Sequence, residues 1–504
     1  MTDPWLAPDD EHNRRLAGNV RPSDWTNPRP ARRYNLAVIG AGTAGLVTAA
    51  AAAGLGARVA LVEQGLMGGD CLNFGCVPSK ALIRSARAAA SIGEAGAFGI
   101  RVAGEAKVDF TAVMQRLRRL RSDLSVHDSA HRFRELGVDV FFGQARFRGR
   151  TSLIVGDHRI RFKKAVIATG SRPVVPPIPG LAAGEFLTNE NVFSLSSLPT
   201  RLAVIGGGPI GCELAQAFAR LGSRVTILER SPQLLPREDP DVADLLARVF
   251  QEEGIRLHLG ATVDRIEHGD GTHIVHWTQA STAGSSEVDQ ILVATGRQPN
   301  IEDLGLATVG VRADRSGVQV NRRLQTTNSR IYAAGDVCFP YRFTHAADAT
   351  ARLVVENALF FGNRSSDALN IPWCTYTSPE VAHVGLSESE AAKRGLKIGV
   401  FRVGLDAVDR AVLDGRTAGF VKILVRKGSD QLVGATIVAE NAGDMIGELT
   451  LAMDAGLGLK NLSTLIHPYP TQAEAIRKAA DAFQRARLTP FVRRLLGLWF
   501  RLVR

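Results

Sequence analysis

Cysteine is scarce in this chain, which has five in 504 residues. Two of them lie within the segment GGDCLNFGCVPSK, and the other three stand alone at Cys212, Cys338 and Cys374. A structural zinc site usually takes four ligands from two close pairs, and no second pair or H-x3–5-H segment follows here. We therefore expect no metal site, and there are too few cysteines for a disulfide framework.

We expect neither a secretion signal nor a membrane span in this sequence. Its first residues, MTDPWLAPDDEHNRRL, are acidic and interrupted by proline, without an apolar core. The one long uncharged stretch, residues 34–57, is mostly Ala and Gly and contains GAGTAG, so it predicts a buried strand, a tight turn and a buried helix. We expect a cytoplasmic protein, in which thiols stay reduced.

Acidic residues are outnumbered: Lys and Arg total 61 against 50 Asp and Glu, a net charge of +11. A basic chain can bind nucleic acid, but no RRM, zinc-finger or helix-turn-helix pattern accompanies the charge, so we expect no nucleic-acid partner. Anionic small ligands or a membrane surface fit the charge better. The hydrophobic content of 45% is ordinary for a globular enzyme, and the length predicts about three or four domains.

Two segments, residues 34–63 and 201–229, repeat one plan: an apolar β run, a glycine-rich turn, a small-residue helix and a second β run ending in an acid. In each, the acid follows the third glycine of G-x-G-x-x-G by 18 residues, the pattern of a dinucleotide-binding unit. The glycines let the backbone approach a pyrophosphate, the helix N-terminus offers N–H groups, and the acid accepts from a ribose. The alternative is two ordinary βαβ units without a ligand. The residues are Gly40, Gly42, Gly45 and Glu63, and then Gly206, Gly208, Gly211 and Glu229.

Three later apolar runs, AVIATG, ILVATG and IYAAG, each stop at a glycine. A small residue at such a strand end, as at Gly170 and Gly296, lets the chain pass close beneath a cofactor. Asp336 follows the last run and is placed to bind a ribityl or phosphate-side hydroxyl; the alternative is a cap of the strand-end turn. Two dinucleotides in one chain suggest an electron relay.

The cysteine segment continues as GCVPSKALIRSARAAA, which predicts a helix beginning near Cys76. Pro78 suits the first turn, and small and apolar residues follow. The field of the helix N-terminus, with Lys80 one turn on, favours the thiolate of Cys76. Cys71 lies in the preceding glycine-rich loop, free to close onto Cys76. A redox pair therefore fits better than half a metal site or two inert buried cysteines.

The motif G-G-x-C-L-N-x-G-C-V-P-S-K after a first dinucleotide fingerprint resembles the class I, FAD-dependent pyridine nucleotide–disulfide oxidoreductases. The resemblance runs from about Tyr34 to about Ala482 and is strongest to the mercuric reductase branch, through LAVIGGGPIGCELAQAFARLGSRVTILER and LLPREDPDV. It implies an α/β fold with two Rossmann-like dinucleotide-binding domains, for FAD and NAD(P), and a C-terminal α+β dimerisation domain in a homodimer. The implied parts are an N-terminal arm (1–33), two FAD-binding segments (34–200 and 299–370), an NAD(P)-binding domain (201–298), a dimerisation domain (371–484) and a basic amphipathic tail helix (485–504).

The resemblance also implies roles for the motif residues. FAD would lie on the first fingerprint, with Asp336 at its ribityl chain and Thr344 at a helix start beneath the pyrimidine end of the flavin. NADH or NADPH would lie on the second fingerprint. Cys76 would be the thiolate in charge-transfer contact with flavin, and Cys71 the interchange thiol that meets the acceptor. The remaining matches are Lys80, near flavin N5, and Glu213, its carboxylate partner.

The acid of the second fingerprint bears on the choice of nicotinamide. Glu229 should accept from the 2′-OH of NADH and repel the 2′-phosphate of NADPH, although Arg230 beside it would weaken this bias. Mercuric reductases favour NADPH and lack an acid here. Glu229 is therefore a departure from that branch, and it predicts NADH.

The segment LIHPYPTQAEAIRKAAD (465–481) departs from the family at a catalytic position. Disulfide reductases carry a histidine there, supplied by the other subunit as acid–base partner of the interchange thiol; this chain has Tyr469, whereas Glu474 keeps its place. His467 stands two residues too early and is interpreted as a loop residue. A tyrosine of pKa about 10 is a poor base at neutral pH. A disulfide substrate would lose an acid–base step, of order 10²–10⁴ in rate, and a thiophilic metal ion would suffer less.

The sequence leaves three alternatives for the acceptor. Tyrosine at this position also occurs in mercuric reductases, so Hg²⁺ or a related thiophilic species leads. However, the last cysteine is Cys374, so the C-terminal cysteine pair that hands Hg²⁺ to the buried pair in that branch is missing. A disulfide substrate such as dihydrolipoamide follows, and a redox-responsive, membrane-associated binding protein is the non-enzymatic alternative.

The last residues, RARLTPFVRRLLGLWFRLVR (485–504), contain six arginines and no acid. Beyond Pro490 the large apolar residues recur at helical spacing and leave most of the arginines off that stripe. Such a helix, residues 488–504, either rests on the anionic inner surface of a membrane or packs on the dimer.

Overall fold

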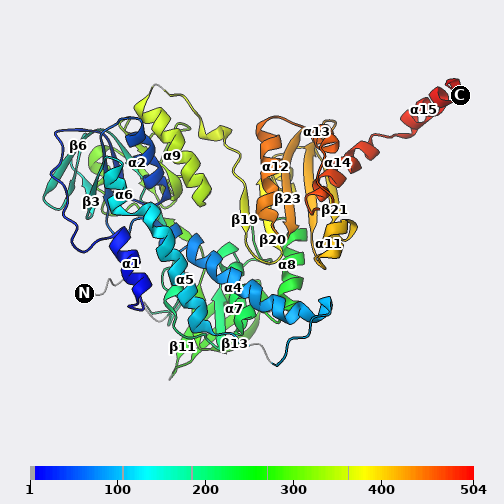
Figure 1. Cartoon of the computed structure of the whole chain (residues 1–504), viewed down its shortest axis with the longest axis horizontal. Coiled ribbons are helices and arrows are strands. Elements are labelled where there is room, and N and C mark those ends of the chain that lie inside the picture. The colour runs from blue at the N-terminus through cyan, green and yellow to red at the C-terminus, as the bar shows by residue number, and fades with distance from the viewer. Residues whose placement is uncertain (1–5, 105–106, 183–185, 270, 361, 504) are drawn as a thin grey trace. The chain divides into compact units, whose positions relative to one another are not determined.

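A computed structural model describes residues 6–104, 107–182, 186–269, 271–360 and 362–503 (Figure 1). The chain separates into two compact units. The first unit comprises Met1–Arg230 and Glu253–Leu369, and the second comprises Ser231–Glu252 and Asn370–Arg504.

The first unit is built on a seven-stranded sheet in the order β3-β2-β1-β6-β5-β4, with β18 paired to β6. β3, β2, β1, β6 and β18 run parallel to their neighbours in this set, whereas β4 and β5 pair antiparallel beside β6. The parallel pair β1 and β2 is therefore joined by a crossover helix. The bounds are β1 Tyr34–Ile39, β2 Val59–Glu63, β3 Val138–Phe142, β4 Ala145–Phe147, β5 Ser152–Val155, β6 His158–Ile167 and β18 Ile331–Ala333.

A second parallel sheet of the first unit, in the order β10-β9-β8-β14, repeats the plan. Helix α2 (Thr43–Gly54) joins β1 to β2, and α7 (Pro209–Leu221) joins β8 to β9 in the same way. The predicted α/β class with two dinucleotide-binding folds is confirmed. The bounds are β8 Arg201–Ile205, β9 Arg224–Glu229, β10 Arg256–Leu259 and β14 Gln290–Val293, with an antiparallel sheet of β11 Ala261–His268, β12 His273–Gln279 and β13 Thr282–Val288 beside them in the sequence.

The other elements of the first unit surround these sheets. Its small two-stranded sheets are β7 Ser171–Pro173 with β15 Arg297–Pro299 and β16 Ala313–Asp314 with β17 Gly317–Val318. Its other α-helices are α1 Glu11–Val20, α3 Gly69–Asn73, α4 Cys76–Glu94, α5 Phe110–Leu124, α6 Ala130–Glu135 and α9 Thr344–Leu359. The 3-10 turns are η1 Ala95–Phe98, η2 Ser125–Asp128, η3 Val192–Ser194, η4 Leu306–Val309, η5 Gly335–Val337 and η6 Ser366–Ala368.

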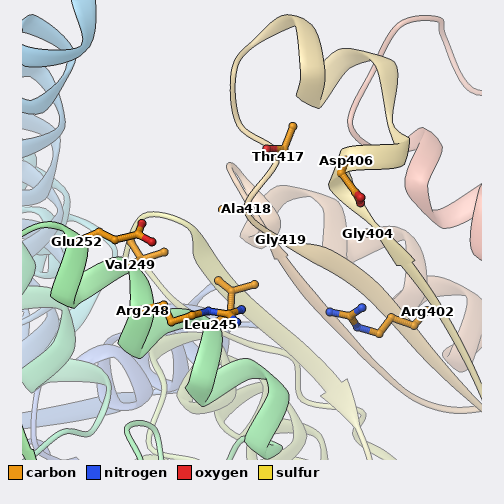
Figure 2. A pocket seen from close by; sticks show the side chains of 10 residues that line it. All are labelled: Leu245, Arg248, Val249, Glu252, Arg402, Gly404, Asp406, Thr417, Ala418 and Gly419. Atoms are coloured by element: carbon orange, nitrogen blue, oxygen red, sulfur yellow. The ribbon is translucent and has the colours of Figure 1, made fainter.

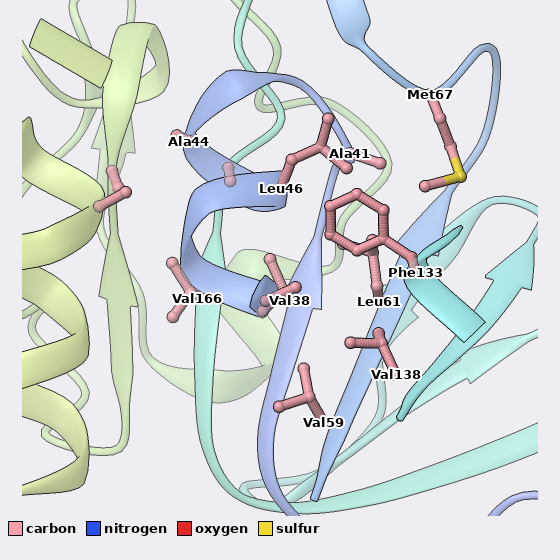
Figure 3. Close-up of a cluster of buried hydrophobic side chains, with 14 of the residues drawn as sticks. Val38, Ala41, Ala44, Leu46, Val59, Leu61, Met67, Phe133, Val138 and Val166 are labelled. Carbon is pink, nitrogen blue, oxygen red and sulfur yellow. The ribbon is translucent and has the colours of Figure 1, made fainter. Parts of the chain in front are cut away.

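The core of the first sheet explains why its sequence is so apolar. Figure 3 shows Val38, Val59 and Leu61 of the central strands packed with Phe133 of α6. Four consecutive residues of β1 are buried, because a central parallel strand is covered on both faces. The Ala-rich helix α2 packs closely on α9, whose facing residues are also small. Small side chains at this contact let the helices approach beside the first fingerprint.

The second unit is a five-stranded antiparallel sheet in the order β19-β20-β23-β22-β21. Its strands are β19 Trp373–Thr375, β20 Glu380–Gly385, β21 Ile398–Gly404, β22 Phe420–Arg426 and β23 Leu432–Ala439. Its helices are α8 Pro240–Glu252, α10 Glu388–Lys393, α11 Asp409–Leu413, α12 Ala442–Asp454, α13 Leu459–Thr464, α14 Glu474–Ala486 and α15 Pro490–Leu502, with the 3-10 turn η7 Leu405–Ala407. Apolar faces of α12 and α14 cover the sheet. This is the α+β arrangement expected of the C-terminal domain.

A buried lysine ties α8 to this second sheet. Lys422 of β22 is 1% exposed, and its Nζ lies 3.0 Å from Asp239, 2.8 Å from Asp241 and 2.9 Å from Glu388. A buried ammonium needs such partners because desolvation of an unpaired charge is costly. The bonds hold residues 231–252, which lie inside the sequence range expected for the NAD(P) domain, within the second unit. Among the described residues, no helix has both the length and the apolar character to cross a membrane.

Candidate active site

The two cysteines of the redox motif lie at the junction of two helices. Cys71 is in the short helix α3, and Cys76 is the first residue of α4. The predicted helix start at Cys76 is confirmed. The prediction that Cys71 lies in a glycine-rich loop is wrong, because Gly68 and Gly69 take positive φ angles that turn the chain into the short helix α3, and Asn73 Nδ2 donates to the carbonyl of Gly69.

The environment of the pair makes Cys76 acidic. Both cysteines are free thiols; Cys76 is exposed and Cys71 is half-buried. The pKa of Cys76 is lowered to about 6, chiefly by a hydrogen bond from the Cys71 thiol and also by the Thr344 hydroxyl and the Lys80 charge. The same hydrogen bond is the largest cause that raises the pKa of Cys71. At neutral pH one sulfur is therefore a thiolate and the other keeps its proton.

Thr344 begins α9, as predicted, and touches the sulfur of Cys76. Its Oγ1 lies 3.2 Å from Cys76 Sγ, close enough to donate to the thiolate. The contact brings a residue 268 positions later in the sequence onto the redox pair. A hydroxyl donor here stabilises the charged form of Cys76.

An ion pair joins the cysteine helix to the second fingerprint helix. Lys80 Nζ of α4 lies 2.7 Å from Glu213 Oε2 of α7, and Glu213 is buried. The predicted pairing of these two residues is present in the structure. Because Glu213 is buried, it fixes the lysine in one place rather than leaving it in solvent.

The first fingerprint has the geometry that its glycines predict. Gly40 has a φ of +97°, and a Cβ there would collide with the carbonyl oxygen of Ala168. A Cβ on Gly45 would collide with the carbonyl oxygen of Gly40, so only glycine lets α2 start this close to β1. Glu63 ends β2 and accepts hydrogen bonds from the backbone N–H of Ala41 at 2.6 Å and of Gly65 at 2.7 Å. Its burial raises the pKa of the Glu63 carboxyl.

The second fingerprint repeats these contacts. Gly206 has a φ of +111°, and Gly211 packs on the carbonyl of Gly206 as Gly45 does on Gly40. Glu229 ends β9 and accepts from the backbone N–H of Gly207 at 2.5 Å. The two acids predicted at the strand ends therefore occupy equivalent positions.

Asp336 lies in η5, and its carboxylate accepts from Ser171 Oγ at 2.6 Å. Ser171 in turn accepts from Arg297 Nε at 2.8 Å. Burial raises the pKa of the Asp336 carboxyl. Gly170 and Gly296, at the two strand ends, both have a positive φ. A Cβ added at either glycine would meet no protein atom within 4 Å.

The residues at both fingerprints fit a dinucleotide. Gly42 and Gly208 are the N-cap residues of α2 and α7, and neither helix has a side-chain cap. A Cβ on Gly208 would meet no protein atom within 4 Å. A Cβ on Gly42 would meet only the Cα of Gly69, at 3.7 Å. Uncapped N–H groups facing such space are what a pyrophosphate requires. FAD held at the first site would supply the two-electron transfer between NAD(P)H and the sulfur pair.

Sequence reasoning missed several partners of the predicted residues. Ser171 and Arg297 follow the strand-end glycines Gly170 and Gly296 directly, so the ATGSR and ATGR runs held a signal for them. Arg297 also lies 3.3 Å from Asp70, the neighbour of Cys71. No comparable signal points to these residues as a connected set, because β7 and β15 pair only in three dimensions.

The predicted C-terminal residues lie in the second unit. Tyr469 is 71% exposed, and its hydroxyl donates to Asp409 at 2.9 Å, which raises the pKa of Tyr469. Glu474 is buried at the start of α14, and Arg477 donates to it at 3.3 Å. His467 lies outside any helix or strand, with its Nε2 3.1 Å from Glu448. Sequence reasoning gave no sign of Asp409.

A shallow hollow of about 260 Å³ also lies in the second unit, between α8 and the sheet (Figure 2). Arg248 and Arg402 line it together with Glu252 and Asp406, so its charges balance. None of the predicted site residues lines it. No group of three or more potential metal-binding side chains occurs in the part of the chain that the structure describes.

Family models match most of the chain. The pyridine nucleotide-disulphide oxidoreductase model matches residues 34–352, and the dimerisation domain of the same family matches residues 371–480. The chain belongs to the pyridine nucleotide-disulphide oxidoreductase family. It is an FAD-dependent, NAD(P)H-using disulfide oxidoreductase with a dimerisation domain, which confirms the predicted class, cofactors and homodimer.

Individual relatives extend this result. A mercuric reductase of Staphylococcus aureus is 37% identical over 453 residues, which cover 90% of this chain and 83% of that protein. A dihydrolipoyl dehydrogenase of Thermus scotoductus is 35% identical over 463 residues, which cover 90% of this chain and 98% of that protein. The Cu(II) complex of the HOCl-induced flavoprotein disulfide reductase RclA from Escherichia coli matches with a TM-score of 0.79 and 32% identity, over 90% of this chain and 100% of that chain.

Loss of the Thr344 hydroxyl should make Cys76 less acidic. In the dithiol protein the thiolate of Cys76 should disappear as the pH falls through about 6. Because the hydrogen bond lowers the pKa, Thr344→Val should move this transition upward by about one pH unit. Ultraviolet thiolate absorbance against pH measures it, with Cys76→Ser as the control that removes the transition. A wild-type midpoint near the ordinary thiol value, or no change in Thr344→Val, would contradict the assignment.

Proposed function

We propose that the Cys71–Cys76 pair passes its electrons to a thiophilic metal ion, with Hg²⁺ or a related ion as the leading acceptor. The observation that carries this proposal is the state of Tyr469, where disulfide reductases of the family have a histidine. Its bond to Asp409 raises a pKa that is already too high for proton exchange at neutral pH. A metal acceptor needs no proton at that step.

The sulfur chemistry balances for such an acceptor. Two thiol groups lose two electrons and one S–S bond forms between Cys71 and Cys76. One Hg²⁺ gains both electrons, whereas Cu²⁺ takes one each, so two copper ions would be reduced to Cu⁺. The thiol protons leave to solvent, and above pH about 6 Cys76 has already lost its own. Only the proton of Cys71 then remains to be released. Cys71 meets the acceptor and Cys76 faces the flavin in this proposal.

The relatives support a metal acceptor. Several are named mercuric reductase, and the RclA structure was determined as a Cu(II) complex. Copper therefore joins mercury among the ions to be tested. Thiolates are soft ligands that suit both Hg²⁺ and reduced copper.

A disulfide substrate is the second candidate. The dihydrolipoyl dehydrogenase relative is matched over 98% of its length at 35% identity, so the whole architecture is compatible with that reaction. If this protein reduced a disulfide substrate, the reaction would need a proton donor for the leaving thiolate. The family's histidine position holds Tyr469 here, and His467, two residues earlier, lies with its Nε2 3.1 Å from Glu448.

The remaining assignments belong to the same proposal. Lys80 and Glu213 act beside the flavin, and Glu229 directs the second site toward NADH. The flavin is held by the first fingerprint together with Gly170, Asp336 and Thr344. Gly296 borders the nicotinamide site. The proposed domain limits are those of the sequence: 1–33, 34–200 with 299–370, 201–298, 371–484 and 485–504.

The tail helix adds a proposed contact with an anionic membrane at its cytoplasmic surface. No described residue of α15 is buried, and Phe491, Trp499 and Leu502 are 70%, 59% and 82% exposed. By contrast α14, just before it, buries Ile476 and Phe483 against the sheet. An apolar stripe that the rest of this chain leaves exposed, flanked by arginines and free of acids, suits an anionic lipid surface; packing on the second subunit is the alternative.

Placing a histidine at position 469 should shift the acceptor preference from metal ions toward disulfides. Tyr469→His should raise lipoamide or glutathione disulfide reduction by about 10²-fold, because it supplies a proton donor, and should change Hg²⁺ or Cu²⁺ reduction little. Steady-state NAD(P)H oxidation with each acceptor measures both. Cys71→Ala is the matched control: it should abolish acceptor reduction while NAD(P)H still reduces the flavin. Full activity of Cys71→Ala, or wild-type turnover of a disulfide faster than of any metal ion, would refute the proposal.

The second fingerprint should favour NADH. Glu229 would accept from the ribose 2′-OH and repel a 2′-phosphate, so wild-type kcat/KM should be higher for NADH. Glu229→Ala should lose this preference. A tenfold wild-type preference for NADPH would show that Arg230 outweighs Glu229.

Truncation should separate membrane docking from dimer packing. The full chain should sediment with anionic liposomes at low salt and less at high salt, whereas a chain lacking residues 488–504 should not. Liposomes of neutral lipid are the matched control. Equal sedimentation of both chains, or a truncated chain that becomes monomeric by light scattering, would overturn the membrane contact.

A further inference from the structure

Residues 6–21, which precede the family match, pack against the redox motif. Helix α1 is capped by Asp10 and lies along α5 (Figure 1). Leu16 and Val20 of α1 are fully buried in the same apolar cluster as Met67 and Leu72. Met67 precedes α3, and Leu72 follows Cys71 within it. This segment of the N-terminal arm is therefore part of the surroundings of the cysteines.

A buried arginine connects α1 to the cysteine helix. Arg121 of α5 is 3% exposed; its Nη2 donates to Asn13 Oδ1 at 2.6 Å, and its Nη1 donates to the carbonyl of Asn73 at 2.8 Å. Asn73 is the last residue of α3, two positions after Cys71. It also donates to the carbonyls of Met67 at 3.0 Å and Gly69 at 2.8 Å. One side chain thus bridges α1 and the turn that carries Cys71.

A second set of bonds holds the start of the same turn. The N–H of Met67 donates to the carbonyl of Val20 at 3.1 Å. Arg21 Nη1 donates to the carbonyls of Gln64 at 2.6 Å and Gly65 at 3.0 Å. Residues 64–73 are therefore tied at both ends to residues 13–21.

The buried guanidinium makes this bridge depend on its acceptors. Burial is the largest cause that lowers the pKa of Arg121 to about 10, so the ion is desolvated. It has no carboxylate among its described hydrogen bonds, only the amide oxygen of Asn13 and the carbonyl of Asn73. A buried charged donor that loses an acceptor costs more than an exposed one, so loss of Asn13 should let Arg121 and the turn beneath it shift.

We propose that residues 6–21 form an intramolecular clamp that fixes Cys71 against Cys76, with Arg121 as its positioning residue. This inference rests on the proposed relay through the two cysteines. Disulfide formation requires the sulfurs to meet at about 2 Å in a defined dihedral geometry, and the thiol–thiolate bond requires them to stay close between turnovers. A turn held at both ends limits the movement of Cys71 between these two states.

The test compares two variants of the same helix. Asn13→Ala removes one of the two acceptors of Arg121, the one on α1. Arg15→Ala breaks the pair of Arg15 with Asp123, at 2.7 Å, which does not reach the redox turn. Asn13→Ala should move the Cys76 thiolate transition upward and slow acceptor reduction through the thiols by about tenfold or more. Reduction of ferricyanide, which takes electrons from the flavin directly, should not change. Arg15→Ala should resemble wild type in all three measurements.

The conservative variant Asn13→Asp keeps an acceptor oxygen and should restore the wild-type transition. If Asn13→Ala folds poorly, Arg121→Lys, which keeps the charge but cannot bridge both acceptors, should show the same loss. An Asn13→Ala protein indistinguishable from Arg15→Ala, or one that loses ferricyanide reduction in parallel with the thiol reaction, would overturn the clamp. The wild type separates this failure from failure of the relay: without two new thiols per chain after NAD(P)H reduction, the relay itself is wrong.

Discussion

The Cys71 thiol donates a hydrogen bond to Cys76, and the chemistry of the site depends on that bond. It keeps the proton on one sulfur and the charge on the other, so the two cysteines are chemically different before any substrate arrives. Thr344, whose Oγ1 lies 3.2 Å from Cys76 Sγ, and Lys80, one turn further along α4, reinforce the charge. The bond survives only while α3 and α4 keep their relative position, which makes the backbone around Gly68 and Gly69 part of the chemistry.

The two fingerprints show how one backbone solution serves two ligands. In both, a glycine carbonyl packs under a third glycine, a helix starts without a cap, and an acid at the next strand end accepts from a backbone N–H. The turn itself therefore does not distinguish the sites. The difference lies in their neighbours: the first is bordered by the cysteine motif and η5, and the second is linked to that motif by Lys80 and Glu213.

The sequence predicted those parts of the site that local geometry dictates. The fingerprint glycines, the helix start at Cys76 and the pairing of Lys80 with Glu213 follow from short motifs or from the family likeness. It did not predict α3, because two left-handed glycines and the Asn73 amide make a helix where composition indicates a loop. It also missed Ser171, Arg297 and Asp409, since each meets its partner through strand pairing or packing between distant segments. The parallel sheets were predictable because buried central strands need continuous apolar runs.

The buried lysine of the second unit sets a limit on where this protein can be divided. Lys422 draws two of its three carboxylates, Asp239 and Asp241, from a segment that precedes the dimerisation sequence by more than a hundred positions. A fragment cut at residue 371 would retain only Glu388 opposite a desolvated ammonium. The second unit is thus discontinuous in the sequence, and a fragment that keeps all three partners of Lys422 must contain residues 239–241 as well as the dimerisation sequence.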